Sequence, residues 1–271
     1  MEITRFTLAA TRMRTEGLRP VGHICVLFFV ALGLAGSIVP SMQCQTVGTG
    51  TPASIAELMQ RGEHDLEEGR STLEERTLTS ARQSFEECAH LDGKNARCFY
   101  DLARTDSYLV KVADARHDKQ AARWLDSAIE NAQRSIDLND QSSDAHALLA
   151  DLYGSKISFG GAFAGMKYGP KANDETHRAF QLDANNPRAY AVIGRRYLYA
   201  PKIFGGDLDK AIESFRKSTE LEPHGDEAFV WLAIAYRKKG DTAHAQAAIK
   251  EAVHLNGRNV FAKRIESGAV E

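Results

Sequence analysis

The chain has 271 residues, of which 43% are hydrophobic, and its 34 Lys and Arg against 36 Asp and Glu give a formal net charge of −2. The two signs of charge are interspersed without a basic block, which argues against nucleic acid and against an anionic membrane surface as the partner. The apolar content is sufficient for a continuous core over the folded part of the chain.

The first 44 residues have the order of a secretory signal. An apolar run over residues 24–39 follows four arginines and precedes small and polar residues. As a helix this run spans about 24 Å, short of the roughly 30 Å hydrocarbon core, so a cleaved signal is favoured and a membrane anchor is the alternative. We therefore expect a signal peptide over residues 1–44, a flexible leader over 45–54, and a periplasmic or secreted protein.

A ladder of small and large residues repeats through the rest of the chain. Its clearest copy consists of Ala211, Phe215, Ser218 and Pro223, followed by Phe229, Leu232, Ala233 and Tyr236. The ladder returns around residues 172–197 and over 245–252, with a period of about 34 residues in its shortest copy. Apolar residues recur every three to four positions and no alternation with period two is evident, which predicts helices and no strands.

This ladder resembles the tetratricopeptide repeat, a helix–turn–helix unit whose copies stack into a superhelix. The resemblance implies an all-α, right-handed α-solenoid that holds another molecule and has no catalytic centre. We expect the solenoid domain at residues 55–271, with units near 55–95, 96–142, 143–186, 187–225 and 226–259 and a cap at 260–271. Residues in excess of 34 per unit are expected in extended loops between the first helix (A) and the second helix (B) of a unit. The prolines after residue 45 are expected outside helices or at their starts.

Two of the expected loops carry the same motif, Lys-Ile-(Ser)-Phe-Gly-Gly, at the same point of consecutive units. The motif residues are Lys156, Phe159, Gly160 and Gly161, and then Lys202, Phe204, Gly205 and Gly206. Stacking places both loops on one edge, where paired lysines, aromatic rings and loop N–H groups suit an anionic or carboxylate-bearing ligand. The alternative is structural, with Gly-Gly closing a tight turn and the Phe packed beneath it as a plug.

The Gly-Gly loops also resemble the extracytoplasmic tetratricopeptide component associated with tripartite (TRAP) substrate transporters. That resemblance implies a periplasmic ligand or a substrate-binding protein as the partner.

A second candidate surface is the concave groove that helix A lines in this repeat family. Its candidate residues are Tyr100, Arg104, Arg188, Arg195, Trp231 and Arg237. Arginine and aromatic residues are typical of protein-binding surfaces, whereas the alternative is a solvated helix face with ordinary Arg–Asp pairs.

Cys88 and Cys98 flank Gly93 in the expected hairpin between the first two units. They are disulfide candidates in an oxidising compartment, and two buried free thiols are the alternative. The histidines and carboxylates show no spacing of a metal site, and no nucleophile motif is present. We therefore expect no catalytic residues, metal or cofactor.

The sequence thus predicts an exported, non-enzymatic scaffold that binds a protein or peptide. The alternative is a periplasmic carrier or transport accessory that binds a small anionic ligand through the Lys-Ile-Phe-Gly-Gly loops. Nucleic acid and, after signal cleavage, a membrane are not expected as partners.

Overall fold

The computed structural model describes residues 53–268, so the predictions on the signal peptide and on most of the leader lie outside it. All of these described residues belong to one compact unit of the chain. Within the described residues, no helix combines the length and apolarity needed to cross a membrane.

The described residues form ten α-helices and one short 3-10 helix, and they contain no strand. The elements are α1 (Ile55–Thr72), α2 (Glu75–Leu91), α3 (Ala96–Ala115), α4 (Gln120–Leu138), α5 (Ser143–Leu182), α6 (Pro187–Tyr199), η1 (Lys202–Phe204), α7 (Leu208–Leu221), α8 (Asp226–Lys239), α9 (Thr242–Leu255) and α10 (Val260–Glu266). The all-α solenoid fold is confirmed.

The A helices start where the five units were expected to begin. Side-chain caps fix several of these starts, because the Ser54, Asn95, Ser142 and Asn186 side chains each accept a hydrogen bond from a backbone N–H of the first turn. The start of α8 differs, since Gly225 precedes it without a side-chain cap.

Close packing of A against B explains the small residues of the ladder. A Cβ on Gly62 of α1 would lie 2.6 Å from the Phe85 ring of α2, and a Cβ on Gly194 of α6 would lie 2.7 Å from the Phe215 ring of α7. Both rings are fully buried. The same small-to-large contact therefore joins the helices of units one and four.

The extra residues of the long units mostly lengthen helices, which corrects the expectation of extended loops. Helices α1–α4 have 17–20 residues each. In unit three the segment is helical on both sides of Gly161, which has φ 61° and ψ −147°. The two arms fold back on each other, and the rings of Tyr153 and Tyr168 stack with centroids 5.6 Å apart. Among the described residues, the longest connection within a unit joins α6 to α7 over residues 200–207, and a shorter turn over 116–119 joins α3 to α4.

Pro170 lies inside the second arm of α5, so the expectation that no proline falls within a helix is wrong. A proline there removes the N–H that would bond the carbonyl of Met166. Both residues are exposed, and water can therefore satisfy that carbonyl.

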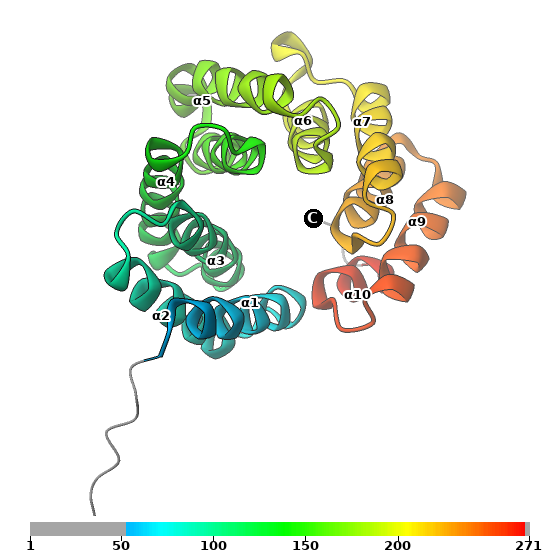
Figure 1. Cartoon of the computed structure of the whole chain (residues 1–271). Coiled ribbons are helices and arrows are strands. Elements are labelled where there is room, and N and C mark those ends of the chain that lie inside the picture. Colours follow the sequence, from blue (N-terminus) through cyan, green and yellow to red (C-terminus); the bar gives the residue numbers. More distant parts are fainter. Residues whose placement is uncertain (1–52, 269–271) are drawn as a thin grey trace, which may run out of the picture. The chain divides into compact units, whose positions relative to one another are not determined.

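The succession of helix pairs closes on itself. Helix α10 packs on α8 and α9 as a cap, and it also lies against α1 (Figure 1). The contact centres on the Asp226 carboxylate, which accepts hydrogen bonds from Arg70 Nη1 (2.9 Å), Asn256 Nδ2 (2.8 Å) and Asn259 Nδ2 (2.7 Å). Asn256 Nδ2 also donates to Ser71 Oγ at 2.9 Å. We call these five residues the closure cluster; it joins the first unit to the last.

Candidate functional site

Closure brings side chains of α1, α3, α6 and α8 together on the inner face. The Tyr108 hydroxyl of α3 donates a hydrogen bond to Glu227 of α8 at 3.0 Å, and Lys111 Nζ lies 3.5 Å from the same carboxylate. The group that we call the central cluster consists of Tyr100, Arg104, Tyr108, Arg188 and Glu227. Part of the predicted concave groove is therefore bridged by the protein's own side chains.

The charge state of the central cluster follows from its surroundings. Desolvation opposes ionisation of Glu227, but Lys111, Arg70, Arg188 and the Tyr108 hydrogen bond together lower its pKa to about 2. Burial raises the pKa of Tyr108 above the usual range of tyrosine, as it does for Tyr100. At neutral pH the cluster therefore combines arginines, one carboxylate and neutral phenols.

Arg188 is the cation of this cluster that lacks a hydrogen bond. Its Nε is buried without a partner, and the nearest carboxylate oxygen, from Asp144, is 3.8 Å away. The side chain is 34% exposed. It lines a hollow of about 320 Å³ whose other residues are Ser142, Ser143, Asp144, Asp183, Asn186, Pro187 and Glu222. A planar guanidinium suits a carboxylate, but the carboxylates of Asp144, Asp183 and Glu222 also line this hollow and oppose the approach of an anion.

The other predicted groove residues have partners in the protein. Arg104 Nη1 donates to Asp101 at 3.0 Å, and the guanidinium lies over the ring of Tyr100, which is buried. Arg104 thus forms an Arg–Asp pair, but the pair is not on a solvated face, because Asp101 is fully buried and the Arg104 side chain is 15% exposed. Tyr100, Arg104 and Arg188 form one group.

The remaining three groove residues lie apart from that group. Arg195 Nε donates to Asp151 at 3.0 Å, and its guanidinium lies 5.3 Å from the centre of the Trp231 ring. Trp231 is half-buried and also packs against Phe261. Arg237 Nη2 donates to the carbonyl of Ile265 at 2.8 Å, which ties α8 to α10. Arg237 therefore stabilises the contact between α8 and α10, whether or not it also contacts a partner.

The two Lys-Ile-Phe-Gly-Gly segments differ in local structure. The first is the tip of the α5 hairpin, and the second is η1 followed by Gly205 at φ 89°. Phe159 is 48% exposed and Phe204 is 67% exposed, so the alternative that these rings are buried plugs is wrong. Lys156 forms an ion pair with Asp126 of α4, whereas Lys202 forms none with the described residues. Gly206 is needed for space, since a Cβ there would lie 1.8 Å from the carbonyl oxygen of Ala200.

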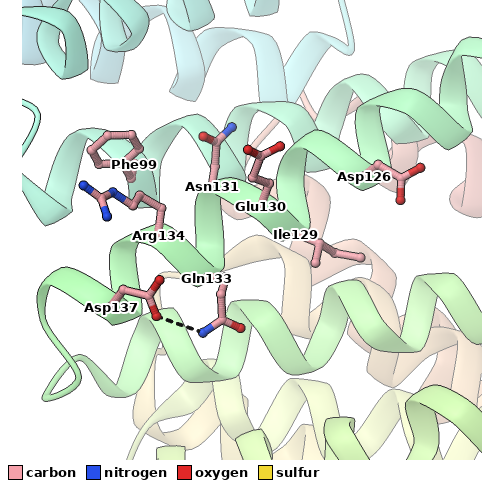
Figure 2. Close-up of a pocket in the computed structure, with 8 residues that line it drawn as sticks. All are labelled: Phe99, Asp126, Ile129, Glu130, Asn131, Gln133, Arg134 and Asp137. Atoms are coloured by element: carbon pink, nitrogen blue, oxygen red, sulfur yellow. Dashed lines mark hydrogen bonds between the residues drawn. The ribbon is translucent and has the colours of Figure 1, made fainter.

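A larger hollow of about 620 Å³ lies along α4 beside the start of α3. Its residues are Phe99, Asp126, Ile129, Glu130, Asn131, Gln133, Arg134 and Asp137. Figure 2 shows that Asp126 lies at one end of this stretch and Phe99 and Arg134 at the other, so the side chains do not converge on one point. We assign no ligand to it.

The predicted disulfide partners face each other across the hairpin between α2 and α3. Cys88 and Cys98 are joined in the structure, with their Cα atoms 5.9 Å apart, and both are fully buried beside Leu58. Within residues 53–268, no group of three or more His, Cys, Asp or Glu side chains is placed to hold a metal ion.

Residues 63–266 match the family model described as regulator of microtubule dynamics protein 1-3. The chain belongs to this family. A rat member, regulator of microtubule dynamics protein 3, is 24% identical over 232 residues, covering 78% of this chain and 46% of its own length. The BBSome complex member BBS4 of Bos taurus is 33% identical over 75 residues, which are 28% of this chain and 13% of that protein. The chain thus spans less than half the length of these relatives.

Solved structures support the fold of this member of the regulator of microtubule dynamics family. The tetratricopeptide-repeat protein TTC0263 of Thermus thermophilus aligns with a TM-score of 0.63 at 18% identity, covering 80% of this chain and 98% of that one. The tetratricopeptide resemblance inferred from the ladder is therefore confirmed.

Sequence reasoning missed Arg70, Tyr108, Asp226 and Glu227, because their importance depends on closure. One signal was present in the chain. Asp226 and Glu227 stand directly after Gly225, where the earlier A helices have a capping Asn or Ser before their first residue.

Proposed function

We propose that this chain is an exported, non-enzymatic scaffold that binds a protein or peptide, and that an acidic group of the partner is held by Arg188. The tetratricopeptide fold indicates a protein-interaction scaffold. The observation that supports Arg188 is its buried Nε, which no protein group satisfies, beside an open hollow. Since Nε itself is buried, a partner carboxylate would bind the accessible part of this side chain, which is 34% exposed, and such charge-assisted bonds contribute about 1.5–3 kcal/mol.

Neighbouring groups favour an extended acidic segment over an isolated anion. Arg195 and Trp231 lie further along helices α6 and α8, and both side chains remain partly accessible. A peptide anchored at Arg188 can therefore pack its next residues against the Trp231 ring, as aromatic anchors do in many interfaces. The rat relative is named as a regulator of microtubule dynamics, and for this chain that name supports only the general role of holding another protein.

The test uses a fluorescent glutamate-rich peptide with a free C-terminus and measures its binding by anisotropy. Arg188→Ala should weaken binding by about 10- to 100-fold, as expected for the loss of a charge-assisted pair. The matched control is Arg178→Ala. This change removes a cation of helix α5 that is paired with Asp140. Equal affinity of the Arg188→Ala variant and the unchanged protein would contradict the proposal.

A carrier of a small anionic ligand is the second candidate, because the hollow beside Arg188 has the volume of a small-molecule site. Calorimetric titration with succinate distinguishes the two. Binding of succinate that depends on Arg188, without binding of the peptide, would favour the carrier.

Export is tested separately by N-terminal sequencing of the protein recovered from outside the cytoplasm. We expect the mature chain to begin between Ser37 and Val47. Recovered protein that still begins at Met1 or Met13 would instead indicate a membrane anchor.

A further inference from the structure

The connections between helices A and B of units three and four carry most of the exposed large apolar side chains among the described residues. The six residues, which we call the apolar edge, are Phe159, Phe163, Met166, Tyr199, Ile203 and Phe204. The other two exposed large apolar residues, Leu91 and Val260, lie at the end of α2 and the start of α10. Since stacked A helices run the same way, the A–B connections share one edge and these two residues lie on the opposite one.

The apolar edge projects from the molecule. Gly161, at the hairpin tip, lies eight residues beyond Tyr153, which corresponds to about 12 Å of helix. Near the tips, Phe163 is 84% exposed and Ile203 is 86% exposed. Soluble proteins rarely cluster such side chains without a binding partner.

The two chain segments that carry the apolar edge contain charged residues of one sign only. Residues 152–173 and 195–206 contain no Asp or Glu. Lys167 lies next to Met166, Lys202 next to Ile203, and Lys238 Nζ lies 4.3 Å from the centre of the Tyr199 ring. The whole-chain balance, which argued against an anionic surface, conceals this local excess of lysine.

Nearby carboxylates are already engaged by the protein. Asp126 pairs with Lys156, and Asp209 pairs with Lys239. Asp207 accepts hydrogen bonds from the backbone N–H groups at the start of α7. The two ion pairs therefore engage Asp126 and Asp209, whereas Asp207 keeps one negative charge at the base of the η1 loop.

The backbone of the second tip is also suited to an apolar environment. The N–H of Phe204 donates to the Pro201 carbonyl at 2.8 Å, and the N–H of Gly205 donates to that of Lys202 at 3.0 Å. The N–H of Gly206 also donates to the Pro201 carbonyl, at 3.1 Å. These three N–H groups are satisfied internally, which lowers the cost of moving this part of the loop out of water.

We propose that the apolar edge docks on a lipid surface that contains anionic lipids. Phe163, Ile203 and Phe204 enter the boundary between headgroups and acyl chains, and Lys167 and Lys202 bind lipid phosphates. Protein interfaces are depleted of lysine, whereas a lysine whose aliphatic stem lies beside apolar tips is typical of the membrane interface. This docking is independent of the peptide site at Arg188.

The test places an environment-sensitive dye on single cysteines in the full chain. Cys25 and Cys44 are replaced by Ser, and Cys88 and Cys98 are paired with each other. The dye is attached at Phe163→Cys or Ile203→Cys, and at Leu91→Cys as the matched exposed control. A local dye is required because the apolar run at residues 24–39 could by itself carry the chain onto vesicles.

With vesicles of phosphatidylcholine and phosphatidylglycerol, we expect the dyes at positions 163 and 203 to shift to the blue and to be quenched by acyl-chain quenchers. The dye at position 91 should stay in water. Vesicles of phosphatidylcholine alone should give a much weaker response. Each lysine contributes about fivefold to partitioning, so Lys167→Ala with Lys202→Ala should lower the partition coefficient read from the dye at 163 by about 25-fold.

Three results would overturn the proposal. In the first, the dyes at positions 163 and 203 stay in water at every lipid concentration. In the second, the dye at position 91 responds as strongly as those two dyes. In the third, the shift appears without vesicles and grows with protein concentration, which would assign the apolar edge to a second copy of the chain. None of these results depends on Arg188.

Discussion

Replacement of Asp226 by Ala should open the contact between the first and last units. The carboxylate is 3% exposed and accepts three hydrogen bonds, from Arg70, Asn256 and Asn259. Loss of one partner from a buried pair costs about 3–5 kcal/mol. Arg70 retains Glu67 and Asn256 retains Ser71, whereas the buried Asn259 Nδ2 loses its acceptor. We therefore expect a loss of about 3 kcal/mol in the free energy of unfolding.

The control is Arg258→Ala, which removes an ion pair with Glu68 between the same two ends of the unit. Arg258 is 64% exposed, so its loss should cost under about 1 kcal/mol. Denaturant unfolding followed by circular dichroism measures both changes. Hydrogen exchange then locates them, since a repeat protein opens locally and the faster exchange should be confined to α1, α8 and α10. A cost for Asp226→Ala no larger than that of the control, with unchanged exchange in α1, would refute the closure argument.

Three further predictions concern the central cluster, the disulfide and the η1 loop. Glu227→Gln should be less stable than the unchanged protein near neutral pH, because the folded pKa of Glu227 is about 2 against an ordinary 4.5. The difference in unfolding free energy between the two proteins should shrink as pH falls from about 4.5 towards 2, and a difference that stays constant with pH would contradict the prediction. Peptide mapping without reductant should recover Cys88 and Cys98 as one linked pair, and replacing both by Ala should cost up to about 3 kcal/mol by loop entropy; free thiols in protein kept under oxidising conditions would exclude the bond. Gly206→Ala should lower the melting temperature because its Cβ would meet the Ala200 carbonyl, whereas Gly154→Ala, where the structure leaves open space, should not.

The sequence alone determined the elements and their order. Five A helices could be placed from the ladder because its small residues, such as Gly62 and Gly194, must face large rings across each hairpin. Caps such as Asn186 before Pro187 then fixed where these helices start. These signals are local, and each depends on contacts within one unit or between adjacent units. The pairing of Cys88 with Cys98 could be anticipated for the same reason, since only a short hairpin separates them.

Only the tertiary structure decided which units far apart in the sequence contact each other. The curvature of the solenoid accumulates from small rotations per unit, which no residue encodes singly, and so the meeting of Arg70 with Asp226 was not predictable. That meeting decided which inner-face cations are satisfied, and it left Arg188 without a hydrogen bond. Packing within unit three decided that its extra residues would extend helix α5, because the two arms bury Tyr153 against Tyr168. The exposure of Phe159 and Phe204 has the same origin, since a helical arm and a short 3-10 turn leave no cavity beneath the rings.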